Sequence, residues 1–307
     1  MKAWKRFSTG AVVAFGIAAL SVFGNTVHAG VLSSGVVRNG CVIFGTDFGN
    51  SCTMTEAGVN CEGDMLSLPP DSCSHWQFQM RRGGDSVCVQ DVDLSSHNPT
   101  LSLPIKADLS DGAEVFSDSV CVGGTTVGGG SSGGWVTIRT GNGNDDIDFG
   151  DCSCNGGVVG DSEVYGLTNI ATGRGNDQVT VDGAYFHRNV SIRVGSGADD
   201  VTVSDATLEG ELEILAGTNP ENTDVDTVTI EDVGFGDEVL IRTGGGNDSV
   251  TLTNVTCDGT NVPIEVDCGA NGGTLTCNNV DQDCSFVVSL DFDCCNVSSV
   301  NCTEVGC

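Results

Sequence analysis

The chain has 307 residues, including 16 cysteines and 44 glycines, and its formal net charge at pH 7 is −30. A strongly acidic protein is a poor partner for nucleic acids, anionic membranes and polyuronate substrates, because each of them needs positive charge on the protein. Only 6% of the residues are aromatic, which argues against base stacking and against an aromatic platform for sugars.

Residues 1–29 have the pattern of a secretory signal peptide. Lys2, Lys5 and Arg6 precede an apolar run from Ala11 to Phe23, and the segment ends at Ala29. A membrane-spanning helix needs about 20 apolar residues, and this run is shorter. We therefore expect cleavage after Ala29 and no membrane insertion afterwards. The mature chain would carry a net charge of −33. We expect it to be secreted or extracellular, with the periplasm or the cell surface as alternatives.

Residues 30–122 do not follow the pattern found later in the chain. They are rich in cysteine and turn-forming residues, and we interpret them as a disulfide-stapled N-terminal cap, with an independent small β domain as the alternative. Residues 123–134, rich in Gly and Ser, read as a linker. An even number of cysteines in an exported chain favours disulfides over metal sites, and their connectivity stays open.

Residues 135–283 contain one short pattern six times. The copies start at or near these residues: Val136, Ile170, Val190, Leu212, Val239 and Ile264. The glycines that open the turns at Gly173, Gly195 and Gly217 are 22 residues apart, and the other steps are longer because of loop insertions. A repeat of this length indicates a solenoid, in which each unit buries its apolar face against its neighbours.

The apolar residues within each copy alternate, as in Val201 and Val203, which is typical of a strand with one buried face. The sequence therefore predicts an all-β fold: a single-stranded parallel β-helix of about six 22-residue coils, with cysteine-rich caps at both ends, the C-terminal one at 284–307. Two inward columns are expected, Ile138-Ile170-Ile192-Ile214-Ile241-Val266 and Ile147-Val179-Val201-Val228-Val250-Leu275.

An acidic residue recurs at the same point of successive copies. The column is Asp145, Asp177, Asp199, Asp226 and Asp248, with Asp146 and Asp200 beside it and Asn144, Asn176 and Asn247 before it. Equivalent residues of neighbouring coils stack about 4.8 Å apart, so their carboxylates repel unless a cation lies between them or they splay into water. Oxygen ligands beside glycine turns suit calcium, and we predict structural calcium at these ten residues. The alternative is that Gly-x-Gly-Asn-Asp is simply a good turn sequence.

Four copies of the turn resemble the haemolysin-type (RTX) nonapeptide, G-G-x-G-x-D-x-U-x, with the first glycine replaced. They are Thr140–Asp148, Thr172–Thr180, Val194–Thr202 and Thr243–Thr251. The resemblance is to right-handed parallel β-helix repeats that bind calcium between coils, and it implies calcium for Asp145, Asp177, Asp199 and Asp248. The chain departs from that family because the nonapeptide occurs once per coil rather than in tandem, and because the presumed export signal is N-terminal.

The other repeated positions carry little chemistry. Thr180, Thr202, Thr229, Thr251 and Thr276 form a threonine column that β-propensity explains. His187, next to Tyr185 and Phe186, reads as a surface residue rather than a catalyst. We therefore expect a non-enzymatic, calcium-binding extracellular protein with a structural or adhesive role, whose partner would be a cell-surface or matrix polysaccharide or protein. The alternative is a carbohydrate-active β-helix enzyme, which a non-repeated acidic cleft would favour.

Overall fold

The computed structural model describes most of the chain after the predicted signal peptide. The described residues are 33–37, 40–44, 49–61, 64–66, 75–80, 83–95, 100–104, 116–129, 134–157, 159–217, 224–259, 261–268, 273–288 and 296–297. The predicted signal peptide and most of the predicted C-terminal cap lie outside these ranges. Within them, no helix is long and apolar enough to cross a membrane.

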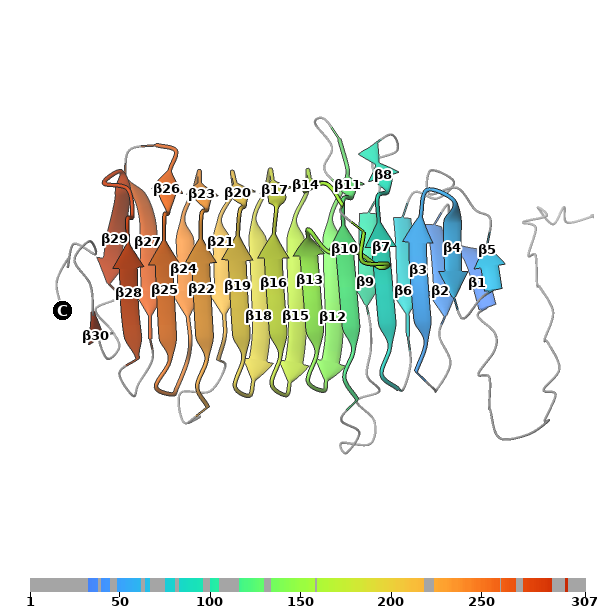
Figure 1. Ribbon diagram of the computed structural model, residues 1–307, viewed down its shortest axis with the longest axis horizontal. Helices are drawn as coiled ribbons and strands as arrows, with labels where there is room; N and C mark the ends of the chain where they lie inside the picture. Colours follow the sequence, from blue (N-terminus) through green and yellow to red (C-terminus); the bar gives the residue numbers. More distant parts are fainter. Residues whose placement is uncertain are drawn as a thin grey trace, which may run out of the picture.

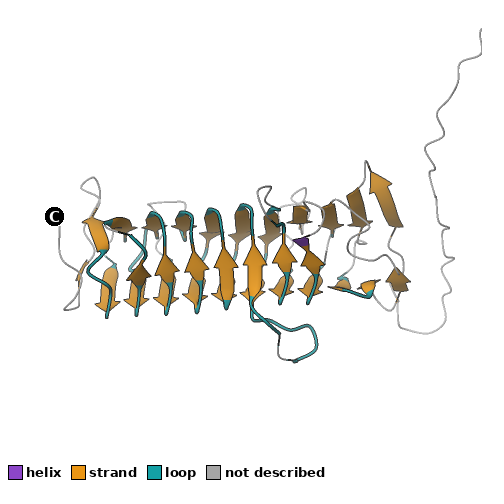
Figure 2. Cartoon of the chain, turned by 90° about the horizontal axis from the view of Figure 1, so that it is seen from above, coloured by secondary structure: helices purple, strands orange, loops and turns teal. Residues whose placement is uncertain are grey.

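The described chain is all-β and forms three sheets, which Figures 1 and 2 show as rows of strands along one axis. The first sheet has the order β1 (Ser33–Val37), β2 (Gly40–Phe44), β6 (His75–Gln79), β9 (Thr100–Pro104), β12 (Val136–Asn142), β15 (Thr168–Arg174), β18 (Val190–Ser196), β21 (Leu212–Leu215), β24 (Val239–Arg242), β27 (Val262–Asp267) and β29 (Cys284–Val288).

The second sheet is β30 (Asn296–Val297), β28 (Thr274–Asn278), β25 (Ser249–Thr253), β22 (Thr227–Glu231), β19 (Asp200–Ser204), β16 (Gln178–Asp182), β13 (Asp146–Gly150), β10 (Ser119–Gly123), β7 (Ser86–Gln90), β3 (Ser51–Thr55), β4 (Gly58–Cys61) and β5 (Asp64–Leu66). The third sheet is β26 (Thr256–Cys257), β23 (Gly234–Phe235), β20 (Thr207–Leu208), β17 (Ala184–Phe186), β14 (Ser162–Val164), β11 (Thr126–Val127) and β8 (Asp93–Leu94).

The chain visits the three sheets in turn, and we call one such passage a coil. After β15, β16 and β17, for example, the strands β18, β19 and β20 each pair in parallel with the equivalent strand of the preceding coil. This order of parallel pairing is compatible with the β-helix that the repeat predicts.

Both predicted inward columns are confirmed. Ile138, Ile170, Ile192, Ile214, Ile241 and Val266 are in register along the first sheet, and Ile147, Val179, Val201, Val228, Val250 and Leu275 are in register along the second. All twelve side chains are buried. Each contributes about 1.5–3 kcal/mol through burial, and it does so only because the next coil covers it.

The coil pattern begins earlier than the sequence indicated. β6, β7 and β8 form one coil and β9, β10 and β11 the next, and these strands pair in parallel with the later ones. The strands from β6 to β11 therefore belong to the same three sheets as the repeats. β29 and β30 extend the sheets likewise at the other end.

Antiparallel strands lie only at the N-terminal end of the described sheets. β1 pairs antiparallel with β2, and β4 and β5 follow β3 as antiparallel strands. The Cys52–Cys61 disulfide joins β3 to β4. These strands cover the edges that would otherwise stay unpaired, which is the task expected of a cap.

Disulfides also hold a loop to the outer face of the second sheet. Cys88 and Cys121 are neighbours in register on β7 and β10, and they bond to Cys154 and Cys152 of the loop that follows β13. Cys257 and Cys284 form another bridge. None of the cysteines in the described part is free, as expected for an oxidising compartment.

Candidate functional site

The predicted aspartates form a continuous ladder along the corner between the first and second sheets. Each carboxylate oxygen Oδ1 accepts a hydrogen bond from the backbone N–H of the equivalent residue one coil earlier. The donor–acceptor pairs, at 2.8–2.9 Å, are Asn50–Asp85, Asp85–Asp118, Asp118–Asp145, Asp145–Asp177, Asp177–Asp199, Asp199–Asp226 and Asp226–Asp248. The stacked column that the sequence predicts is therefore present, and it is two aspartates longer than expected.

The ladder faces inward rather than toward solvent. Its aspartates are at most 2% exposed, and their second oxygen, Oδ2, is buried without a hydrogen-bond partner in six of the seven. Because burial penalises the ionised form, the pKa is raised at every rung. It reaches about 8 at Asp118, about 7 at Asp199 and Asp226, and about 6 at Asp85 and Asp177.

Neighbouring side chains explain why the pKa differs between rungs. A nearby threonine hydroxyl opposes the effect of burial at Asp177 (Thr172), Asp145 (Thr140) and Asp248 (Thr243) without bonding to the Oδ2 atom, since Thr172, for example, donates to the Val194 carbonyl oxygen at 2.7 Å. No threonine hydroxyl contributes at Asp199 or Asp226, where the charges of neighbouring aspartates raise the pKa further. Those two rungs hold protons most tightly among the predicted ligands whose values are resolved.

The ladder cannot be fully ionised without a counter-charge. Two carboxylates one coil apart, at about 4.8 Å, repel by about 3.5 kcal/mol at an effective dielectric constant of 20. A hydrogen bond to a charged acceptor contributes only about 1.5–3 kcal/mol. Protons or cations must therefore neutralise part of the column, and the unpartnered Oδ2 atoms are where either would bind.

The turns beside the ladder leave no room for side chains. A Cβ on Gly175 would lie 1.6 Å from the carbonyl oxygen of Gly143, and one on Gly197 would lie 1.6 Å from that of Gly175. Both glycines also have positive φ angles, 134° and 139°. Close stacking of the turns thus requires glycine whether or not a metal is bound, which supports the turn-chemistry interpretation without excluding calcium.

The remaining predicted ligands do not join the buried column. Asp146 and Asp200 are exposed on the second sheet, two coils apart with Gln178 between them. Asn144, Asn176 and Asn247 are exposed on the turns. The Oδ1 atoms of Asn144 and Asn176 accept hydrogen bonds from the N–H groups of Asn176 and Ala198 at 2.9 and 3.1 Å, so they form a shorter outer ladder.

The calcium prediction therefore rests on the inward aspartates. They offer a buried donor set of carboxylate oxygens beside turn carbonyls, which is chemically suited to calcium. Within the described ranges, the one group of three clustered ligand side chains is Cys88, Cys121 and Cys154, and the two disulfides account for it. Any calcium on the ladder would thus draw on two carboxylates of adjacent coils and on backbone oxygens.

A second cluster lies on the outer face of the third sheet and the corner after it. The His187 ring is held between two carboxylates, with Nε2 3.0 Å from Glu163 Oε1 and Nδ1 2.9 Å from Glu209 Oε2. Tyr165 stacks on this ring with centroids 4.2 Å apart, and the Tyr185 hydroxyl donates to Glu209. We call Trp135, Glu163, Tyr165, Tyr185, His187 and Glu209 the aromatic–acidic patch.

The patch is net negative even when His187 is protonated, because one imidazolium faces the carboxylates of Glu163 and Glu209. Burial lowers the pKa of His187, but hydrogen bonds to Glu163 and Glu209 outweigh that effect and raise it. The pKa of Glu163 is lowered mainly by its hydrogen bond to His187, and that of Glu209 by hydrogen bonds from Tyr185 and His187. The histidine side chain is 23% exposed, so solvent reduces the strength of these ion pairs.

The coil period of the sequence already relates the members of this patch. Tyr165, His187 and Glu209 are separated by 22 residues each, the coil period, so they belong to one column. Tyr165 and Tyr185 are the only tyrosines of the chain. The low aromatic content argues against a sugar-binding platform only if the aromatic residues are dispersed over the molecule. The fold instead brings Trp135, Tyr165 and Tyr185 together in one patch.

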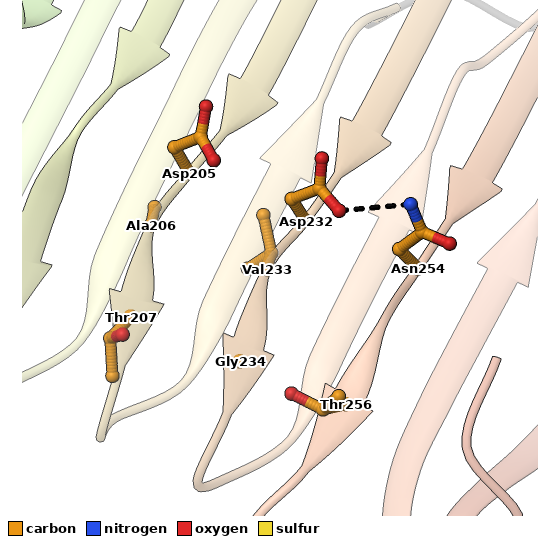
Figure 3. Close-up of a pocket in the computed structure, with 8 residues that line it drawn as sticks. All are labelled: Asp205, Ala206, Thr207, Asp232, Val233, Gly234, Asn254 and Thr256. Atoms are coloured by element: carbon orange, nitrogen blue, oxygen red, sulfur yellow. Dashed lines mark hydrogen bonds between the residues drawn. The ribbon is translucent and has the colours of Figure 1, made fainter. Parts of the chain in front are cut away.

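Two shallow hollows lie on this side of the molecule. One, of about 280 Å³, is lined by Trp135, Tyr165, Gly166, Leu167 and Arg188. The other, of about 390 Å³, lies over the start of the third-sheet strands, where Gly234 has no side chain between Thr207 and Thr256 (Figure 3). Along its edge Asn254 donates to Asp232 at 2.9 Å.

Comparisons with protein-family models, with known proteins and with solved structures find no match to this chain. Function must therefore be argued from the two sites themselves.

Proposed function

We propose that the protein is a secreted, single-stranded parallel β-helix that serves as an extracellular structural or adhesive scaffold, with calcium neutralising its aspartate ladder. The proposal rests mainly on the row of buried Oδ2 atoms in stacked coils that have no hydrogen-bond partner. A cation that contacts carboxylates of adjacent coils would join them, so calcium would act as a structural ion.

Disulfides and charge support the extracellular part of the proposal. The described cysteines are all oxidised, and the mature chain would carry a net charge of −33. Such a surface keeps the protein soluble and attracts cations from a medium where calcium is available.

A carbohydrate-active enzyme is the second candidate, because Glu163, His187 and Glu209 form an acidic cluster that the other coils do not repeat. Glycoside hydrolysis generally needs one carboxylic acid with a raised pKa. The pKa values of Glu163 and Glu209 are both lowered, so neither would be protonated at neutral pH. We therefore favour binding over hydrolysis at this cluster.

Calorimetric titration of the mature protein with calcium at pH 7.5, with magnesium as the control ion, tests the proposal. We expect calcium uptake at up to millimolar concentrations, and a melting temperature that rises with calcium and falls with EGTA. If calcium addition releases or absorbs no binding heat and EGTA leaves the melting temperature unchanged, the calcium proposal is wrong. Release of reducing sugars from a polysaccharide panel would instead favour the enzyme.

A further inference from the structure

We propose that the aromatic–acidic patch and the adjoining hollow bind an uncharged saccharide. This inference rests on the adhesive part of the proposed function and is independent of calcium. It names the ligand class that the surface of the scaffold would recognise.

The hollow combines apolar ring faces with polar groups at its rim. Trp135 and Leu167 line it and are 50% and 49% exposed, which is unusual for large apolar side chains in the described residues. Tyr165 lines it too, and Arg188 contributes the polar edge. Sugar rings have an apolar C–H face and a rim of hydroxyl groups, so the two surfaces are complementary.

The platform is held rigid before any ligand arrives. Tyr165 is stacked on His187 with an angle of 18° between the ring planes, and His187 is fixed by two carboxylates. The neighbouring carboxylate of Glu163 also raises the pKa of the Tyr165 hydroxyl above its usual value. A preorganised surface loses little conformational entropy on binding, which matters for a ligand that makes weak contacts.

The charged groups around the hollow make it less suitable for polyanions and cations than for uncharged ligands. A polyanion would meet Glu163, Glu209 and a mature net charge of −33. A cation in the hollow would lie beside Arg188, which lines it, and would find Glu163 and Glu209 already hydrogen-bonded to His187. An uncharged ligand avoids both penalties, and its hydroxyls can hydrogen-bond to groups of either charge.

The size of the hollow limits how much ligand it holds. Pockets that enclose a drug-sized ligand measure about 300–1,000 Å³, so 280 Å³ suits a short segment of a glycan. The hollow of Figure 3 lies farther along the same sheet, since Thr207 in its wall pairs with Tyr185 of the patch. Its carboxylate, amide and hydroxyl groups would suit a continuing polar chain.

The test is an isothermal calorimetric titration of the full mature protein and each variant with neutral oligosaccharides (gluco-, manno- and xylo-oligomers), with tryptophan fluorescence as a second readout in the proteins that keep Trp135. Trp135 is the exposed tryptophan of the described chain, whereas Trp76 is buried, so ligand stacking should change its emission. We expect Trp135→Ala and Tyr165→Ala to weaken binding at least tenfold. Tyr165→Phe, which keeps the ring, should retain most of it.

Phe116→Ala is the matched control, because Phe116 is 44% exposed and is not part of the patch. It should bind like the wild type, and the melting temperatures of all variants should be compared first. The titration is run with calcium and with EGTA, so that loss of the calcium proposal leaves this one testable. Absence of binding to every neutral glycan, unchanged binding in both alanine variants, or binding to polyanions or peptides alone would overturn the inference.

Discussion

Replacing Asp199 separates the two roles of a ladder carboxylate, which are to accept a backbone hydrogen bond and to carry charge. Asp199→Ala removes the acceptor for the Asp177 N–H, and an orphaned buried donor costs about 1–3 kcal/mol of unfolding free energy. Asp199→Asn keeps an oxygen acceptor and removes the charge. An asparagine fits this corner of the coil, since Asn50 is buried at the first position of the ladder, where its side-chain amide donates to Asp85 Oδ1 at 2.9 Å.

The magnitude follows from the pKa. A value of about 7 against the ordinary 3.8 corresponds to a cost of about 4 kcal/mol in calcium-free protein at pH 8. Asp199→Asn relieves that cost, but it buries an amide N–H₂ group, which lowers the stability by about 1–3 kcal/mol. We expect a net gain of about 1–3 kcal/mol in EGTA at pH 8, which is a rise of about 3–10 °C in melting temperature.

The raised pKa of Asp199 also makes the stability of the fold depend on pH. A carboxyl whose pKa is raised on folding stabilises the fold below its unfolded pKa, and that stability is lost as the pH rises through the folded pKa. Calcium-free wild type should therefore lose stability between about pH 4 and 8, and Asp199→Asn should lose less. Scanning calorimetry at pH 4.5 and 8, with and without calcium, measures this. A lower melting temperature for Asp199→Asn than for the wild type at pH 8 in EGTA would refute the reasoning.

Three further predictions concern other parts of the molecule. Gly175→Ala should cost at least about 3–5 kcal/mol or prevent folding, because of the clash with Gly143 and the positive φ, whereas Gly160→Ala, with open space around it, should melt like the wild type. NMR titration should place the pKa of His187 above 6.5, and an unshifted value would contradict the geometry. The ion pairs should stabilise the fold most at about pH 5–6, which is above the unfolded pKa of the glutamates and below that of the histidine. Their contribution should fade as the pH rises through the folded pKa of His187. Cys88→Ser with Cys154→Ser should lower stability by about 2–4 kcal/mol and expose the loop after β13 to protease without opening the sheets, and circular dichroism that loses its β signal would contradict this.

The repeat predicted the core correctly because the 22-residue period is directly visible between Gly173 and Gly217. The earlier coils escaped notice because their loops vary in length, so that Asp85 and Asp118 lie 33 residues apart. The run Gly83-Gly84-Asp85-Ser86-Val87 nevertheless repeats the order of Gly246 to Val250, with Gly84 in place of Asn247. The ladder could have been extended from that run.

Side-chain direction was harder to predict than register. The sequence placed Asp145, Asp177 and Asp199 in one column, and that column exists. An aspartate at the end of a turn can face either solvent or the corner of the coil, and alternation within the strands does not decide between them. The backbone N–H of the neighbouring coil decides it, and that contact appears only once the coils are stacked. The patch around His187 was missed because its members come from three coils.

The most direct test of the ladder's need for a counter-charge is a crystal structure of the mature protein grown with calcium and then with terbium as an anomalous substitute. The account predicts metal peaks beside the Oδ2 atoms between Asp145 and Asp248. A column without metal peaks, with bound calcium found only at exposed residues such as Asp146 and Asp200, would contradict it.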